Sequence, residues 1–231
     1  MEPMDREFLP EPAGETPEAG PTTPAIAGHE ASPEGGGPVR GSETSRSRRD
    51  LLRTATLFYA ALMLVPLWWM AASEGPNPFY PEGFSWADTI GGFILGTLAA
   101  LAVVALSGIV MSRTRWGRAL TQAFARVLGP LSRLQVLWLA LLSGVGEEMF
   151  FRGLLQPTLG LTITSVVFGL LHFVPRREMF PWTIFSIAAG FLLGWLYAFA
   201  GTLVAPIACH ALVNGINLAR IAGERRAGAC G

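Results

Sequence analysis

Long stretches without charge are the feature that most limits what this chain can fold into. Thr54–Ser73 holds about twenty consecutive residues with no charged side chain, and a helix of that length spans the roughly 30 Å hydrocarbon core of a membrane. Further candidate spans, apolar over most of their length, follow at Thr89–Ser112, Leu134–Gln156, Thr158–Pro175, Trp182–Gly201 and Thr202–Ala222. The sequence therefore predicts an all-α, polytopic membrane protein with about six transmembrane helices.

Composition supports this class and argues against one soluble domain. Only 15% of the residues are charged and the mean hydropathy is +0.41, whereas a soluble domain is about 25% charged. Every basic residue is an arginine, and no basic patch of the kind that binds nucleic acid is present. We expect the lipid bilayer and a membrane-anchored protein or peptide substrate as partners, and no nucleic acid.

The first fifty residues differ from the remainder. They hold eight Pro, seven Gly and ten acidic residues, a composition that buries too little apolar surface to offset its ordering entropy. No signal-peptide pattern is present. We predict a disordered cytosolic N-terminal tail over 1–50 and a transmembrane domain over 51–231.

Arginine placement predicts the topology. With six spans and a cytosolic N-terminus, the cytosolic segments hold all but one of the body's arginines, and the external segment Glu74–Trp86 holds none. The positive-inside rule requires this asymmetry. We expect a multi-pass protein of the cell inner (plasma) membrane, with the N-terminus and the C-terminus both cytoplasmic.

Two other patterns concern packing. The segment 113–133 alternates arginines with Trp116, Leu120, Phe124 and Leu128 at helical spacing, which predicts an amphipathic helix on the cytosolic membrane face. The second span contains Gly92-x-x-x-Gly96, a spacing that allows close contact between helices.

Polar side chains inside a membrane are the primary candidates for a site because each costs about 2.5–3.5 kcal/mol to insert. The predicted spans hold Glu147, Glu148 and Arg152 in the third, His172 in the fourth, and His210 with Asn214 in the sixth. Each alone has a structural alternative, as an ion pair or an interhelical hydrogen bond. Their concentration in three spans favours one shared polar site.

Helical geometry gives these residues distinct directions. Glu148 and Arg152 lie four residues apart on one face and can form an ion pair, whereas Glu147 lies about 100° further round the helix. A carboxylate beside such a pair is a suitable general base for water. His210 and Asn214 also share a face, one turn apart.

The depths of these groups do not match if all helices are straight. At 1.5 Å per residue, Glu147 lies about 21 Å past Arg133, whereas His172 lies only about 6 Å before Arg176. We expect helix tilt, or a third span that begins after Gly129-Pro130 later than Leu134, to bring them to one level in the cytosolic half.

Three ordered motifs carry a family resemblance. Glu147-Glu148-Met-Phe-Phe-Arg152 matches E-E-x-x-x-R, Phe168-Gly-Leu-Leu-His172 matches F-x-x-x-H, and His210-Ala-Leu-Val-Asn214 matches H-x-x-x-N. The chain resembles the CPBP family of intramembrane proteases, also called the CAAX-protease, bacteriocin-processing or Abi family, whose relatives include the Ras-converting prenyl-protein endopeptidase. The resemblance covers about Leu134–Asn217 and implies a four-helix catalytic core there.

The resemblance also implies roles. Glu147 would be the base that activates water, with His172 helping to hold the water, and Glu148 and Arg152 would orient and support that base. His210 and Asn214 would form the oxyanion hole, since amide hydrolysis needs donors where negative charge develops.

Metal dependence has two readings. Two His and a Glu are an accepted Zn²⁺ ligand set, and if the protein is metal-dependent the ligands would be Glu147, His172 and His210. The H-E-x-x-H pairing is missing. We favour a metal-free mechanism without a cofactor, with Zn²⁺ as the alternative.

The substrates implied are a prenylated C-terminus, a bacteriocin leader or a C-terminal sorting tail. The Lys-free, Pro-, Gly- and Ala-rich composition is typical of a high-GC bacterium and favours tail processing. Two other classes use membrane Glu, Arg and His: a proton-coupled transporter, and a non-catalytic scaffold or immunity protein. Against transport, no paired broken helices are apparent in the two halves.

Overall fold

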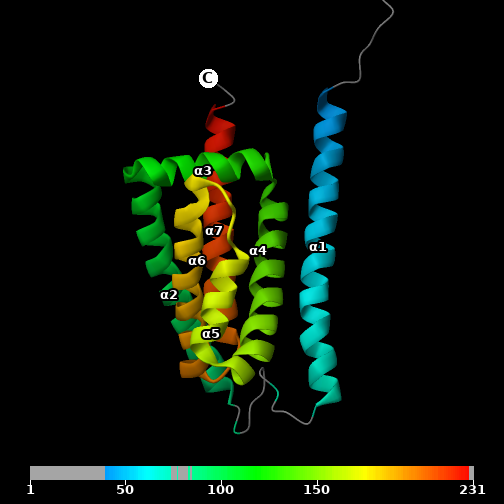
Figure 1. The fold of residues 1–231 in the computed structure, drawn as a ribbon, viewed down its shortest axis with the longest axis vertical. Coiled ribbons are helices and arrows are strands. Elements are labelled where there is room, and N and C mark those ends of the chain that lie inside the picture. The colour runs from blue at the N-terminus through cyan, green and yellow to red at the C-terminus, as the bar shows by residue number, and fades with distance from the viewer. Residues whose placement is uncertain (1–39, 74–76, 78–82, 84, 229–231) are drawn as a thin grey trace, which may run out of the picture. The chain divides into compact units, whose positions relative to one another are not determined.

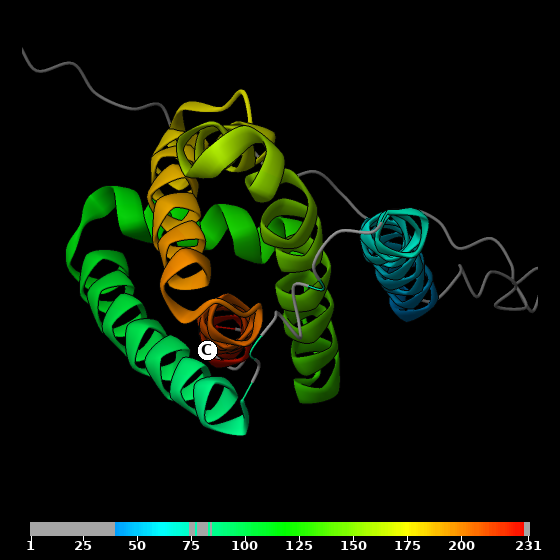
Figure 2. The same ribbon diagram turned by 90° about the horizontal axis from the view of Figure 1, so that it is seen from below.

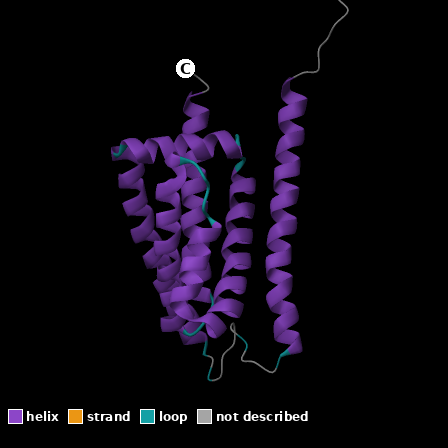
Figure 3. Ribbon diagram, in the orientation of Figure 1, coloured by secondary structure: helices purple, strands orange, loops and turns teal. Residues whose placement is uncertain are grey.

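A computed structural model describes residues 40–73, 77, 83 and 85–228 of the chain. Most of the described residues are helical, and none of them is in a β-strand (Figure 3). The elements are α1 (Arg40–Ala72), α2 (Trp86–Arg113), α3 (Arg115–Leu128), α4 (Arg133–Glu148), the π-helix η1 (Met149–Leu155), α5 (Gln156–Leu171), the 3₁₀ turn η2 (Arg177–Met179), α6 (Phe180–Ala200) and α7 (Val204–Gly228). The all-α prediction is confirmed.

The predicted N-terminal tail is described only at its end. Residues 1–39 lie outside the described residues, and α1 begins at Arg40, inside the range assigned to the tail. From there α1 runs into the first predicted span and packs against α4 and η1.

Five helices among the described residues are long and apolar enough to cross a membrane: Arg49–Ala72, Trp86–Arg113, Arg133–Leu171, Arg177–Ala200 and Val204–Gly223. The 39-residue member combines the predicted third and fourth spans. Its helix is broken at Gly160, where φ is 79° and ψ is 165°, and the chain turns back there (Figure 1). The break lies at Gly160 rather than at the predicted position between Gln156 and Thr158, because Gly adopts positive φ without steric cost.

Helix α7 is the centre of the bundle. It packs on α2, α4 and α6, and Figure 2 shows it enclosed by these helices. The other four candidate spans each expose several large apolar side chains, whereas the described part of α7 exposes none. Outward-facing apolar side chains suit contact with lipid, so α7 is the span least in contact with the bilayer.

The Gly92-x-x-x-Gly96 spacing is where α2 meets α7. A Cβ atom at Gly92 would lie 3.6 Å from the Cβ of Ala205, an ordinary contact. A Cβ atom at Gly96 would overlap the carbonyl oxygen of Ala205. Gly96 is therefore the residue that allows the two backbones to touch.

The mismatch in depth is resolved by a short α5. Helix α4 begins at Arg133 with a capping box between Ser132 and Gln135, so it does not start late. Instead α5 ends at Leu171, and an extended stretch that includes Arg176 (φ −135°, ψ 133°) carries the chain to the start of α6 (Figures 1 and 3). His172 thereby lies deeper in the bundle than a straight span would place it.

The predicted amphipathic helix is present as α3. It lies across the ends of the neighbouring helices rather than along them (Figure 1), and Thr114 caps its N-terminus by accepting a hydrogen bond from Gly117 N. Its apolar side includes buried Leu120 and Ala123, which pack with Met179.

We predict that Gly96→Ala destabilises the bundle while Gly91→Ala does not. The added methyl at Gly96 collides with the α7 backbone, and such overpacking costs about 1–3 kcal/mol. At Gly91 a Cβ meets nothing within 4 Å, so helix propensity favours Ala there by up to about 1 kcal/mol. Thermal unfolding in detergent compares the two variants. Equal melting temperatures would show that α2 and α7 are not in backbone contact.

Candidate functional site

The Glu148 carboxylate is the centre of the polar cluster. Its Oε1 accepts a hydrogen bond from Arg152 Nη1 at 3.0 Å and one from His210 Nδ1 at 2.7 Å. Glu148 and Arg152 have 0% relative exposure. The i,i+4 ion pair expected from the sequence is confirmed in position, and it also fixes an imidazole on α7.

Arg152 connects this cluster to α6. Its Nη2 donates to the carbonyl of Gly190 at 2.9 Å, and one turn later Gln156 Nε2 donates to the carbonyl of Gly194 at 2.9 Å. Glycine is required at both positions for this close approach, because a Cβ at Gly190 would lie 2.8 Å from Ser165 O and a Cβ at Gly194 would lie 2.7 Å from Gln156 Oε1. The Arg152 guanidinium also lies 4.6 Å from the centroid of the Phe168 ring, within the range of a cation–π contact.

Glu147 points away from the Glu148–Arg152 pair, as its position on the helix predicts. Its Oε2 lies 3.7 Å from His172 Nε2 and 4.0 Å from His210 Nε2. Both distances exceed those of direct hydrogen bonds. This buried oxygen has no hydrogen-bond partner among the described residues, and the two ring nitrogens are the polar atoms that it faces.

The hydrogen-bond partner of His172 Nδ1 determines which ring nitrogen of this histidine carries the hydrogen. Nδ1 lies 2.7 Å from the carbonyl oxygen of Phe168. A carbonyl only accepts, so Nδ1 carries the hydrogen and Nε2 of the neutral ring is an acceptor. The Phe168 ring lies against this imidazole, with centroids 4.7 Å apart.

Asn214 lies one turn beyond His210 on α7. Its Nδ2 donates to the hydroxyl of Ser143 on α4 at 2.9 Å. A Cβ at Gly144 would come within 2.9 Å of Ala211, so the two helices are in close contact there. One hydrogen of the Asn214 amide is thus engaged, and one is left for another acceptor.

Tyr59 of α1 contacts the site from the outer side. Its phenol lies close enough to the Glu147 carboxylate to interact with it electrostatically. The approach depends on Gly146, whose Cβ would lie 3.2 Å from Tyr59 O. One turn earlier, Trp138 Nε1 donates to Thr56 Oγ1 at 3.1 Å, which holds α1 against α4.

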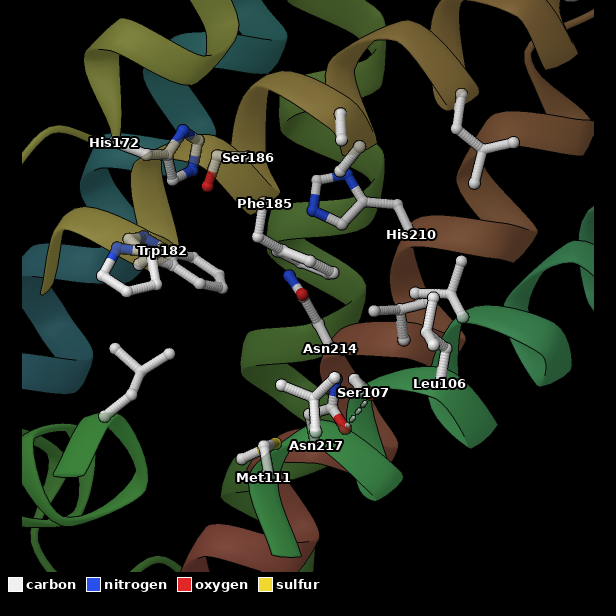
Figure 4. A pocket seen from close by; sticks show the side chains of 18 of the residues that line it. Leu106, Ser107, Met111, His172, Trp182, Phe185, Ser186, His210, Asn214 and Asn217 are labelled. Carbon is white, nitrogen blue, oxygen red and sulfur yellow. Dashed lines mark hydrogen bonds between the residues drawn. The ribbon is translucent and has the colours of Figure 1, made fainter. Parts of the chain in front are cut away.

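A cavity of about 350 Å³ opens beside the cluster. It lies between α2, α3, α6 and α7, and its walls are mostly apolar. His172, His210 and Asn214 form part of its lining, together with Trp182 and Phe185 (Figure 4). The two histidines and the amide therefore connect the buried carboxylates to a space that suits an apolar ligand.

The three residues named as metal ligands do not fit a metal site as placed. Glu147, His172 and His210 have suitable donor chemistry, yet no group of three or more His, Cys, Asp or Glu side chains in the described part is positioned to hold an ion. We derive no step through a metal.

All six residues singled out in the sequence meet in one cluster. Three other participants were not predicted: Tyr59, Ser143 and Gln156. Of these three, Tyr59 could most readily have been noticed in the sequence, because its phenol is a polar group within a mainly apolar span. Ser143 and Gln156 lie one turn from Glu147 and Arg152, and only the packing of other helices shows what they contact. The catalytic roles of the six remain predictions.

Comparison with known proteins confirms the resemblance over part of the chain. The family model described as type II CAAX prenyl endopeptidase, Rce1-like, matches residues 129–216. The uncharacterized protein YpbD of Bacillus subtilis (strain 168) is 36% identical over 91 residues, which are 38% of this chain. The chain spans about half, 47%, of that relative's length. No solved structure matches. The matched segment holds α4, η1, α5, α6 and about the first half of α7, and the family that it resembles is a protease family.

We predict that Arg152→Lys destabilises the protein by about 3 kcal/mol, the lower end of the cost of breaking a buried ion pair. One ammonium cannot reproduce the planar fork that reaches Glu148 and Gly190 together. Arg126→Lys is the control, since Arg126 is exposed on α3 and such surface changes stay within about 0.5 kcal/mol. Thermal unfolding in detergent measures both. Indistinguishable melting temperatures would show that the guanidinium geometry is not needed.

Proposed function

We propose that this protein is an intramembrane endopeptidase that hydrolyses a peptide bond of a lipidated or membrane-anchored protein. The observation that carries the proposal is the unpartnered Glu147 oxygen facing the Nε2 atoms of His172 and His210. A carboxylate that faces two imidazole nitrogens is a suitable arrangement for activating a water that enters with the substrate. The protease-family match over 129–216 supports the same class.

Water between Glu147 and His172 would have both hydrogens engaged. The Glu147 carboxylate accepts one, and the unprotonated Nε2 of His172 accepts the other. The lone pair of the water oxygen is then directed toward the substrate carbonyl. Glu147 takes the proton as the carbon–oxygen bond forms, and later delivers it to the amine that leaves.

His210 and Asn214 would stabilise the oxyanion. Glu148 accepts the hydrogen on His210 Nδ1, so Nε2 of His210 is a donor in the imidazolium form. With His210 as a cation, the two positive charges of His210 and Arg152 match the two negative charges of Glu147 and Glu148. The second amide hydrogen of Asn214 supplies a further donor, and the two donors act where charge develops in the transition state.

The cavity supports a substrate with an apolar element next to the scissile bond. A volume of about 350 Å³ lined by α2, α3, α6 and α7 suits a lipid chain or apolar side chains. Candidate substrates are therefore proteins with a prenylated C-terminus or with a C-terminal sorting tail.

We also propose the orientation of the protein in the inner (plasma) membrane. Helix α3, the Arg176–Arg177 segment and the C-terminal part of α7 lie at the same end of the bundle (Figure 1). An arginine-rich end is retained on the cytosolic side. The cavity beneath α3 would then be on the cytosolic half.

We predict that Glu147→Gln lowers the cleavage rate by about 10²–10⁴, the contribution of a general base, and leaves the protein folded. Gln keeps the shape of the side chain and cannot take a proton. The control is Glu178→Gln, because Glu178 is exposed and lies outside the cluster. Two quenched fluorescent peptides in nanodiscs report cleavage: one ends in a prenylated cysteine followed by three residues, the other in an apolar sorting tail.

Two outcomes would overturn the proposal. One is cleavage by Glu147→Gln at the rate of the unmodified protein. The other is the absence of Glu147-dependent cleavage of either peptide by a preparation that unfolds cooperatively, which would favour a non-catalytic scaffold.

We predict that activity survives exhaustive chelation. In the proposed mechanism side chains alone activate the water, so treatment with a strong chelator leaves the cleavage rate within about twofold of its starting value. A twofold change corresponds to less than about 0.5 kcal/mol in the activation free energy. Metal analysis of the treated sample confirms removal. Loss of activity that Zn²⁺ restores would replace this mechanism with one in which Glu147, His172 and His210 bind metal.

A further inference from the structure

The cavity face of α7 has a third polar residue beyond the two assigned to the oxyanion hole. His210, Asn214 and Asn217 are four and three residues apart, so they share one side of the helix. All three line the cavity, and Figure 4 shows Asn217 beyond Asn214, next to Ser107. The proposed chemistry does not use Asn217.

The side-chain amide of Asn217 is held in a defined orientation. Its Oδ1 accepts from Arg220 Nη1 at 3.4 Å, and it also lies 3.4 Å from Ser107 Oγ, whose one hydrogen is shared with Val104 O at 3.2 Å. Arg220 is anchored in turn, because Nη1 also donates to Val104 O at 2.9 Å. Since a guanidinium only donates, the atom facing it must be the amide oxygen.

This orientation leaves the amide nitrogen for a ligand. No hydrogen bond joins Asn217 Nδ2 to any of the residues that the structure describes. Around it the cavity wall is apolar, with Leu106 and Met111 as neighbours (Figure 4). An unengaged donor in an apolar wall favours an acceptor oxygen on whatever occupies the cavity.

The spacing along α7 indicates which oxygen that would be. At 1.5 Å per residue, Asn217 lies about 7–8 Å beyond the midpoint of His210 and Asn214. An extended peptide advances about 3.3 Å per residue. A substrate carbonyl held by His210 and Asn214 would therefore place a main-chain oxygen two to three residues away near Asn217.

We propose that Asn217 is a specificity-determining residue that binds a main-chain oxygen of the substrate two to three residues from the scissile bond. This inference rests on the proposed function and deepens it. The oxygen belongs to a peptide carbonyl or to a terminal carboxylate, which share acceptor chemistry. Ser107 and Arg220 position the amide, and the apolar wall between Asn214 and Asn217 accommodates the intervening side chains.

The test measures binding separately from cleavage. The full chain carrying Glu147→Gln is placed in nanodiscs, and a fluorescent peptide ending in a prenylated cysteine plus three residues is titrated by anisotropy. A second peptide has the same sequence with a C-terminal amide. Asn217→Asp is the key variant, because it keeps an acceptor for Ser107 and Arg220 and replaces the amide donor with an oxygen.

We expect Asn217→Asp to raise the Kd about tenfold, through a lost hydrogen bond and oxygen–oxygen repulsion, without lowering the melting temperature. Asn217→Leu also weakens binding. Ser112→Ala is the matched control for the neighbouring helix, since its hydroxyl donates to Gly108 O outside the cavity lining, and its Kd stays unchanged. Equal affinity for both peptides assigns the oxygen to a peptide carbonyl, and weaker binding of the amide assigns it to the carboxylate.

An Asn217→Asp variant that binds as tightly as the parent protein overturns the inference, and so does the absence of saturable binding. A different result would contradict the proposed function alone. In that result Asn217→Asp still weakens binding, but the chain with Glu147 intact does not cleave the bound peptide.

Discussion

The buried Glu148 carboxylate is the interaction on which the other parts of the site depend. One oxygen joins Arg152 and His210 at 3.0 and 2.7 Å, and Arg152 extends the connection to Gly190 on α6. Removing charges from water costs several kcal/mol per ion, which is repaid only by such short, well-directed contacts. The network therefore fixes how α4, η1, α6 and α7 are placed relative to each other at this depth.

Small residues on α6 allow the polar side chains of this network to reach their backbone partners. Long polar side chains reach backbone carbonyls only where helices pack without intervening side chains, as α6 does at Gly190 and Gly194. The π-helix contributes as well, since its wider turn carries Arg152 and ends where Gln156 begins the next helix. Such wide turns are frequent at functional sites, and here one follows Glu147 and Glu148 directly and carries Arg152.

The sequence predicted what depends on local pattern. Long apolar segments identify the spans, and a separation of four residues predicts the pairing of Glu148 with Arg152 without knowledge of other helices. Nonlocal outcomes were not predictable in this way. Hydropathy does not fix where a continuous apolar stretch reverses, so the turn at Gly160 and the early end of α5 came only from the structure. Tyr59 likewise depends on how α1 packs at Gly146, a contact between segments far apart in the chain.

The two histidines illustrate why position decides chemistry for identical side chains. His172 has its Nδ1 against a neutral backbone carbonyl, whereas His210 has its Nδ1 against a carboxylate paired with arginine. Under the proposed mechanism the first ring stays neutral and offers Nε2 as an acceptor to water, while the second becomes a cation and offers Nε2 as a donor to the oxyanion. Both Nε2 atoms lie within 4.0 Å of the same Glu147 oxygen. Exchanging the two Nδ1 partners would therefore exchange the donor and the acceptor on either side of the Glu147 carboxylate, and the donor would no longer be on α7 beside Asn214.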